Sequence, residues 1–439
     1  MEINGPVLDT TPLSATYIQT APPPLDAPTL VDRLKVDVAV VGGGYTGLST
    51  ALRLAESGGR VAVLEAREVG WGGSGRAFGQ VVPYAKHDDA AVLKHFGPQW
   101  GERLVAGLAG GPDLVFGLIT QHEISCEAVR AGLIFAAHNQ AAIAGLDQRA
   151  RFWRDRGADV ELVARDTMIA LTGSRYYEAA LLDHRGGTLN PLGYARGLAR
   201  AAIRGGAILF ENSRVIGLNQ TGGGWRLVTA RGEVNAAQVV LATDAYTDDL
   251  WPGLRQSLIP LRAYQLVSAP LSDNLRRSVL PGGQSLSDTR RLYSGIRRRA
   301  DGRLHLSVDG PAFSNTGTAF AAKSSKRLRD LFPQIGELAW EHAVAGWVGM
   351  TEDQYPHIHR LAPGLIAAIG LSGRGIAFGT LLGRDVFRRL TGVPEHDWML
   401  PDTPLRPIRV KPAARPLVGA LLNTYRLLDR WDLRHNAAG

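Results

Sequence analysis

Residues 36–66 constrain the fold of this chain more than any other segment, because they read as a strand, a glycine-rich turn, a helix and a second strand. Residues 36–41 are almost all apolar and mostly β-branched, which is typical of a parallel strand buried on both faces. The residues after the turn carry apolar side chains three and four positions apart, as in a helix that packs on a sheet. The pattern predicts a βαβ unit.

The turn of this unit has the features of a pyrophosphate site. Gly42 permits a tight turn, Gly44 has no Cβ to keep a phosphate from the backbone, and Gly47 lets the helix lie close to the strand. The helix N-terminus adds free N–H groups and a partial positive charge. Glu65 follows Gly42 by 23 positions, close to the roughly 20 expected for an acid that binds a ribose hydroxyl. A dinucleotide site is therefore favoured over a βαβ unit that binds nothing.

Length and composition indicate a globular protein of two or three domains. The chain has 439 residues, 45% of them hydrophobic and 21% charged. Its one cysteine, Cys126, cannot form an internal disulfide, and the first residues lack a basic, apolar signal pattern. A cytoplasmic location is therefore predicted. Uncharged stretches are too short for a membrane span, so no integral membrane segment is expected.

The net charge of +8 is compatible with a nucleic acid, anionic lipid or acidic substrate as partner, or with a solvated basic surface. The densest basic cluster, at residues 290–303, has no nucleic-acid motif around it, so no nucleic-acid partner is predicted. Residues 417–431 have the pattern of an amphipathic helix with basic residues. Docking on its own protein and peripheral contact with a membrane both remain open for that helix.

The rest of the chain suggests a cofactor domain interrupted by a second domain. Residues 1–30 are rich in Pro and Thr and are predicted to be an extended arm. Alternating strand and helix patterns predict a discontinuous cofactor-binding domain at 31–85, 155–255 and 343–395. Helical segments and further strands predict a substrate domain at 86–154 and 256–342, and residues 396–439 form a C-terminal tail. The expected class is α/β, with an α+β substrate domain.

Four separated segments resemble a known family: residues 42–52 with 64–66, residues 70–83, residues 242–247 and residues 370–380. Together they are similar to the FAD-dependent amine and amino acid oxidoreductases of the D-amino acid oxidase superfamily. Within it the γ-glutamylputrescine oxidase group is most similar, with glycine oxidase and monomeric sarcosine oxidase further off. The resemblance covers most of residues 31–395 and implies a Rossmann-like FAD-binding domain interleaved with a mixed-sheet substrate domain. It also implies noncovalent FAD, because the cysteine that attaches flavin in sarcosine oxidases has no counterpart here.

The resemblance assigns cofactor-binding residues in each segment. The expected contacts of the pyrophosphate, adenosine ribose and adenine are Gly42, Gly44, Tyr45, Thr46, Gly47, Glu65, Ala66, Arg67, Val215, Ala242 and Thr243. The expected contacts of the ribityl chain and flavin ring are Gly72, Ser74, Gly75, Arg76, Gln80, Val81, Val82, Gly373, Arg374, Gly375 and Ile376. Arg76 and Arg374 are also compatible with ordinary surface positions.

The substrate expectation rests on what the chain lacks. Members that oxidise α-amino acids often carry a Gly-Leu-Arg-Pro segment whose arginine binds the carboxylate, whereas residues 346–356 contain no arginine. A primary or secondary amine, γ-glutamylputrescine-like or other, is therefore predicted. By resemblance, hydride passes from its carbon to flavin N5, the imine hydrolyses, and oxygen or an unknown acceptor takes the electrons. Neither a catalytic side chain nor a metal is predicted. The candidate pocket residues are Phe78, Tyr264, Arg297 and Trp347.

Three alternatives stay open at this point. The protein could be an amino acid oxidase or dehydrogenase of the same fold, or a non-catalytic FAD-binding partner subunit. The second is supported by the missing arginine and by Ala77-Phe78, where close relatives resemble Arg-Asn. A third alternative is an NAD-dependent dehydrogenase that uses only the first motif.

Overall fold

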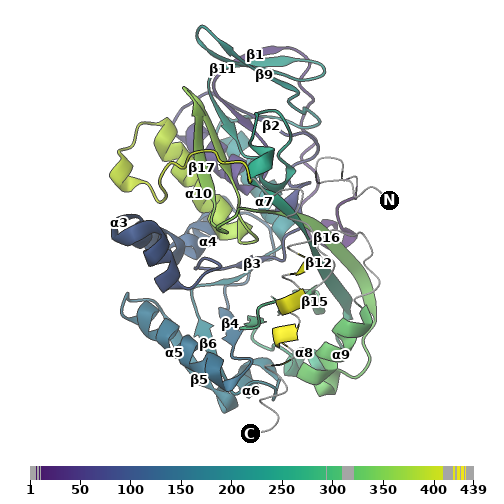
Figure 1. Ribbon diagram of the computed structural model, residues 1–439. Helices are drawn as coiled ribbons and strands as arrows, with labels where there is room; N and C mark the ends of the chain where they lie inside the picture. Colours follow the sequence, from purple (N-terminus) through teal and green to yellow (C-terminus); the bar gives the residue numbers. More distant parts are fainter. Residues whose placement is uncertain are drawn as a thin grey trace.

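A computed structural model describes residues 6, 9, 11–292, 294–308, 321–408, 419–420, 423–425, 427–429 and 431. It contains two large sheets that lie one above the other along the long axis of the molecule (Figure 1). The upper sheet carries the glycine-rich turn and the lower sheet is mixed. This arrangement confirms the predicted α/β class with a second, mixed-sheet domain.

The upper sheet has a parallel centre. Its strand order is β17-β18-β11-β1-β2-β8, with β10 and β9 added beside β11, and β1 pairs in parallel with both β11 and β2. The bounds are β1 Arg33–Val41, β2 Val61–Leu64, β8 Ile208–Phe210, β9 Gly217–Thr221, β10 Gly224–Val228, β11 Glu233–Leu241, β17 His357–Ala362 and β18 Leu365–Ile369. Because β1, β2, β11 and β18 run in one direction, their carboxyl ends meet at one edge of the sheet.

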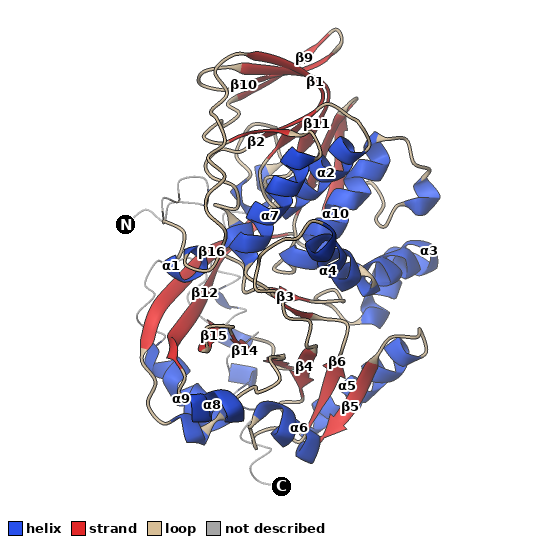
Figure 2. Cartoon of the chain, turned by 180° about the vertical axis from the view of Figure 1, so that it is seen from behind, coloured by secondary structure: helices blue, strands red, loops and turns tan. Residues whose placement is uncertain are grey.

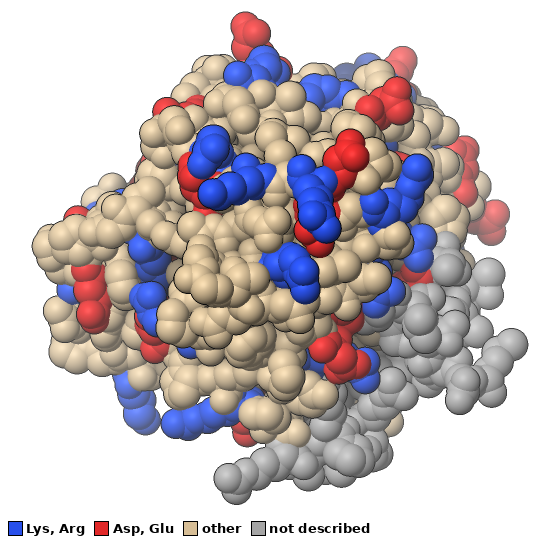
Figure 3. Space-filling model, turned by 90° about the horizontal axis from the view of Figure 1, so that it is seen from above, with Lys and Arg blue, Asp and Glu red and all other residues tan. Residues whose placement is uncertain are grey.

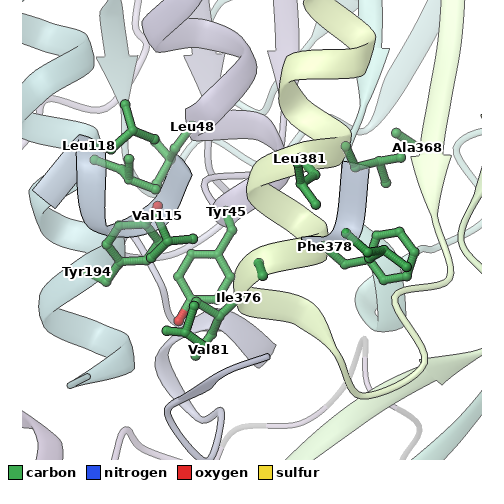
Figure 4. Close-up of a cluster of buried hydrophobic side chains, with 14 of the residues drawn as sticks. Tyr45, Leu48, Val81, Val115, Leu118, Tyr194, Ala368, Ile376, Phe378 and Leu381 are labelled. Carbon is green, nitrogen blue, oxygen red and sulfur yellow. The ribbon is translucent and has the colours of Figure 1, made fainter. Parts of the chain in front are cut away.

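Three helices cover one face of this sheet: α2 (Tyr45–Glu56), α7 (Pro191–Arg204) and α10 (Gly375–Leu390) (Figure 2). Their facing side chains form the largest hydrophobic core. In Figure 4, Tyr45 lies between Tyr194 and Ile376 within this core, with Val81 beside it. The glycine-rich turn is therefore anchored by a helix whose apolar face is buried.

The lower sheet runs β16-β12-β15-β14-β13-β4-β6-β5. The bounds are β4 Leu133–Ala136, β5 Val160–Ala164, β6 Ala179–Asp183, β12 Ile259–Pro270, β13 Ser285–Asp288, β14 Gly295–Arg298, β15 Arg303–Val308 and β16 Trp340–Met350. One face carries apolar side chains such as Ile134, Leu286 and Leu306, which pack against Phe332 after α9. Period-2 alternation turns the other side chains, including Gln265, Arg297 and His305, toward the upper part of the molecule.

The remaining elements surround the lower sheet or connect the two halves. Their bounds are α1 Ala15–Ile18, α3 Asp89–Ala109, α4 Gly111–Gln121, α5 Gln140–Arg154, α6 Arg165–Thr172, α8 Asp273–Ser278, α9 Ala321–Leu331, β3 Gln80–Val81 and β7 Gly187–Thr188. By length and composition, Asp89–Gln121 is the one described helical stretch that could cross a membrane. It is kinked at Gly97 and packs on α10, as core helices of soluble proteins do.

Three observed features differ from the sequence-based expectation. Strands β5 and β6 fall in range 155–255, predicted to belong to the cofactor domain, but β6 pairs with β4 in the lower sheet and β5 pairs with β6. Most of β16 falls in range 343–395 and likewise pairs with β12. The sequence also predicts a strand at 233–235, in a hairpin with 225–230, and a separate strand at 239–243, but these two form one strand, β11, which pairs with β10 at its start and with β1 throughout. A local sequence pattern predicts that a segment forms a strand, but it does not predict which sheet the strand joins.

The C-terminal segment is helical where it is described between residues 419 and 431. The Asp429 carboxylate accepts hydrogen bonds from the backbone N–H groups of Arg291 (3.1 Å) and Leu292 (3.2 Å), so this part docks on its own protein. The other residues of the predicted helix, 417–418, 421–422, 426 and 430, lie outside the described part. Acidic and basic side chains alternate over the face shown in Figure 3, where they form no extended basic stripe.

Candidate active site

A cavity of about 570 Å³ begins at the carboxyl ends of β1, β2 and β11 and extends to the lower sheet. Its walls at the first end come from residues 41–46, 64–67 and 241–248. At the other end they come from β12, β15 and β16. We call the wall formed by Phe78, Ala263, Gln265, Ser307, Trp347 and Val348 the sheet end. A cavity of this size is typical of a cofactor or small-molecule site.

The turn after β1 has the geometry that its glycines require. Gly42 has φ +111°, and a Cβ at Gly47 would stand 2.1 Å from the Gly42 carbonyl oxygen. Gly44 is the N-cap of α2 and lines the cavity, so the first N–H groups of the helix face it. The turn therefore provides the anion-binding surface that the sequence predicts.

Glu65 connects the end of β2 to this turn. Its carboxylate accepts hydrogen bonds from the backbone N–H of Gly43 (2.7 Å) and of Arg67 (2.9 Å). Burial raises the pKa of Glu65, while these backbone hydrogen bonds lower it. Glu65, Ala66 and Arg67 all line the cavity, where an acid suits a hydroxyl ligand.

Arg76 is not a surface arginine, although the sequence leaves that alternative open. It is 3% exposed, and its guanidinium donates to the carbonyl oxygens of Thr11 (2.6 Å), Trp71 (2.9 Å) and Pro12 (3.1 Å). These bonds fix the loop of residues 71–78 between the N-terminal arm and the sheet end. The guanidinium therefore stabilises the backbone of this loop and of the arm, and Arg76 also lines the cavity.

Asp244 joins the ends of two parallel strands, and sequence reasoning missed it. Its carboxylate accepts from the N–H groups of Gly370 (2.8 Å) and Leu371 (3.0 Å), which follow β18. Burial raises the pKa of Asp244. Asp244 lies in residues 242–247, one of the four segments that resemble the family, so the sequence did point to this part of the site. The contact places Ala242 and Thr243 beside the N-terminus of α10, where Gly375, the first residue of the helix, and Gly373, just before its N-cap, also line the cavity.

The structure brings most of the predicted cofactor residues to the cavity but not all. Gly42, Gly44, Tyr45, Thr46, Glu65, Ala66, Arg67, Gly72, Ser74, Arg76, Val215, Ala242, Thr243, Gly373 and Gly375 line it. Gly47, Gly75, Gln80, Val81, Val82, Arg374 and Ile376 do not. Gly47 and Gly75 allow close backbone packing instead, and Val81, Val82 and Ile376 are core residues. The Gln80 amide donates to Ser285 on β13 (2.6 Å), and the Arg374 guanidinium lies 5.1 Å from the Tyr84 ring centroid.

Of the four pocket candidates, Phe78 and Trp347 line the cavity, and Tyr264 and Arg297 do not. Tyr264 alternates with the lining residues Ala263 and Gln265 and packs on the opposite face with Leu266. Arg297 is buried behind Phe78, with its guanidinium 5.6 Å from the ring centroid, and donates to the Leu189 carbonyl oxygen (3.1 Å). Gln265 and Ser307, cross-strand neighbours at the sheet end, were missed because alternation identifies the inner residues only once the inner face is known.

These observations fit FAD. A glycine cradle that a Cβ would fill, a helix N-terminus and an acid at the end of β2 suit the pyrophosphate and ribose, while the cavity continues far beyond them to the lower sheet. A nicotinamide dinucleotide that bound only at the glycine-rich turn would not account for the part of the cavity lined by the loop of residues 71–78 and by the sheet end.

The comparisons with known proteins agree with this geometry. The model of the family described as FAD dependent oxidoreductase (DAO) matches residues 37–389. Gamma-glutamylputrescine oxidoreductase of Escherichia coli K12 is 32% identical over 84% of this chain and 86% of its own length. The probable oxidoreductase OrdL of Haemophilus influenzae is 30% identical over the same shares. The crystal structure of glycine oxidase from Geobacillus kaustophilus superposes with a TM-score of 0.71 at 22% identity, covering 84% of this chain and all of that one.

The chain therefore belongs to the DAO family of FAD-dependent oxidoreductases. It is a flavoprotein enzyme that acts on CH–NH or CH–NH₂ donors, as amine- and amino acid-oxidising members of the family do.

Proposed function

We propose that the protein oxidises a primary or secondary amine that has no carboxylate on the reacting carbon. Noncovalent FAD, held by residues 42–46, 65–67 and 242–243, supplies the two-electron oxidant for the C–H bond next to nitrogen. The single observation that carries the proposal is the uncharged sheet end, where the described lining residues are Phe78, Ala263, Gln265, Ser307, Trp347 and Val348.

Charged residues that line the rest of the cavity already have partners. Arg76 donates to four backbone carbonyls, and Arg214 forms an ion pair with Asp248 (2.9 Å). Glu65 and Asp244 accept from backbone N–H groups. An α-carboxylate at the sheet end would lose its water without gaining a described guanidinium, which costs several kcal/mol, on the order of a buried unpaired charge. A neutral amine carries no such cost.

The side chains of the sheet end bind and orient rather than exchange protons. Phe78 and Trp347 supply apolar surface that excludes water, and the Gln265 amide and Ser307 hydroxyl supply neutral hydrogen-bonding groups. The N-terminus of α10 directs its N–H groups and partial positive charge at the same cavity, which favours negative charge developing on a reduced cofactor. The amine must therefore arrive deprotonated, since no described lining side chain of the sheet end is a base.

The test is an anaerobic screen of amines against the purified, yellow protein. We expect loss of the flavin absorbance band with at least one primary or secondary amine, and slower reduction by its α-carboxylated analogue. Admission of oxygen then distinguishes an oxidase, which recovers its colour within turnover time, from a dehydrogenase. Preference for the carboxylated series would contradict the proposal. No reduction by any amine in the screen would likewise contradict it.

A second candidate, oxidation of an amino acid, is favoured by Arg297. Its guanidinium is buried and forms no ion pair among the described residues, yet it lies 5.6 Å from the ring centroid of Phe78, which lines the cavity. Arg297→Gln distinguishes the candidates. For an amine oxidase the ratio of kcat/KM for an amine and its carboxylated analogue stays unchanged, whereas for an amino acid oxidase any preference for the carboxylate is lost.

A further inference from the structure

The N-terminal arm is built into the sheet end, although it precedes the segment matched by the family model. Tyr17 in α1 is fully buried and lies between the loop of residues 71–78 and the inner face of the lower sheet. Its hydroxyl lies 2.6 Å from the Ala77 carbonyl oxygen and 3.0 Å from the Gln265 side-chain oxygen. Burial raises the pKa of Tyr17, so the hydroxyl remains a donor at neutral pH.

The orientation of the Gln265 amide follows from its other partner. The amide lies 2.7 Å from the Arg76 carbonyl oxygen, which accepts only, so the amide nitrogen faces Arg76 and the oxygen Oε1 faces Tyr17. Gln265 is 5% exposed, and the surface that it retains lines the cavity. Tyr17 and Arg76 thus fix the amide from both sides.

Gln265 Oε1 has two acceptor lone pairs, and among the described contacts the Tyr17 hydroxyl is the one donor to it (3.0 Å). The same hydroxyl also lies 2.6 Å from the Ala77 carbonyl oxygen, and the Tyr17 side chain forms a hydrogen bond with Arg297, so Tyr17 is held in place while it contacts Oε1. Gln265 Oε1 therefore keeps acceptor capacity in a place where water is largely excluded. A buried acceptor that lacks a full donor is stabilised by a ligand that brings an N–H group.

We propose that Gln265 Oε1 accepts a hydrogen bond from the N–H of the substrate amine, and that Tyr17 of the arm is the positioning residue that holds Oε1 in place. This inference rests on the amine substrate proposed above. It makes the arm part of the substrate site, because the arm orients an uncharged acceptor at the sheet end.

The test uses the FAD-bound protein as wild type, Tyr17→Phe, Gln265→Leu, the double variant, and Tyr177→Phe. Tyr177 is the matched control, because it is also buried and its hydroxyl donates to Asp288 (2.9 Å), away from the cavity. The measurements are the Kd of the best amine of the screen, from the saturation of anaerobic reduction, together with FAD content and the melting temperature of each holoprotein.

We expect each single variant to keep FAD and to raise the amine Kd about tenfold, as for the loss of one buried hydrogen bond. The double variant should bind the amine no more weakly than Gln265→Leu, and its loss of melting temperature should be smaller than the sum of the two single losses. Tyr177→Phe should leave the amine Kd unchanged.

The inference would be overturned if the two increases in amine Kd multiplied in the double variant. It would also be overturned if either single variant had the amine Kd of wild type. Both outcomes would leave the proposed amine function intact. A wild-type protein that no amine reduces would overturn the inference and the amine function together. In that case the melting temperatures still test the contact between Tyr17 and Gln265, because that measurement needs no substrate. Losses of melting temperature that simply add in the double variant would show that the contact does not stabilise the protein.

Discussion

Gly44 and Ser74 face each other across the cavity wall so closely that a Cβ at Gly44 would stand 2.9 Å from the Ser74 hydroxyl oxygen. The same oxygen accepts a hydrogen bond from the Tyr45 backbone N–H (3.2 Å), at the first residue of α2. The phosphate-binding turn and the loop of residues 71–78 are therefore one unit, and a side chain at Gly44 would separate them.

Gly44→Val should abolish FAD binding, because the new side chain fills the space through which the pyrophosphate approaches the backbone. We expect a soluble, colourless protein with at least about a tenfold lower ratio of flavin to protein absorbance. Gly145→Val is the control, since a Cβ at Gly145 meets no atom within 4 Å. A yellow Gly44→Val protein with full occupancy would show that this turn is not the cofactor site.

FAD should leave the protein intact when it is denatured by acid or heat. The only thiol, Cys126, is buried outside the cavity, and burial raises its pKa to about 12, which suppresses the reactive thiolate. The measurement is the flavin content of supernatant and pellet after precipitation. Flavin that stays with the precipitate would contradict the prediction and indicate a covalent link to another side chain.

Val348→Arg should create the carboxylate fork that this chain lacks. Val348 lines the sheet end, and its Cγ1 lies 3.8 Å from the position of a Cβ built at Gly373. We expect the kcat/KM ratio of an α-carboxylated amine to its decarboxylated analogue to rise about tenfold or more, as for one charge-assisted pair. Val348→Met controls for side-chain length. Equal ratios in the two variants would mean that the reacting carbon does not approach Val348.

Acidification should destabilise the protein through His359. The ring Nδ1 lies 2.9 Å from the Thr403 carbonyl oxygen, and burial lowers the pKa of His359 from 6.5 to about 4. The unfolded chain takes up a proton as the pH falls through 6.5, but the folded protein does so only near 4. Stability is therefore lost between these values, by about 3 kcal/mol at pH 4.

The check on His359 is the free energy of unfolding by urea at pH 7, 6 and 5, for wild type and His359→Gln. The variant should lose less stability over this range, whereas His396→Gln, on an exposed side chain, should follow wild type. Parallel curves for wild type and His359→Gln would assign the acid sensitivity to other groups.

Local sequence patterns were sufficient to predict the glycine-rich turn of the cofactor half. The spacing of Gly42, Gly44 and Gly47 between an apolar strand and an amphipathic helix leaves one local solution, because backbone sterics and periodicity act over a few neighbouring residues. The flavin was indicated by the resemblance of four separated segments to a known family, and most of the residues which that resemblance assigned to the cofactor line the cavity.

The side chains that line the sheet end could be identified only from the way the two sheets pack. Tyr264 and Gln265 are adjacent in β12, and the sheet face that packs against the cofactor half determines that Gln265 lines the cavity. Tyr17 and Gln265 are 248 positions apart, and Arg297 is directed inward by its pairing with His305. Such contacts depend on how whole sheets pack, and no pattern local to the sequence specifies that packing.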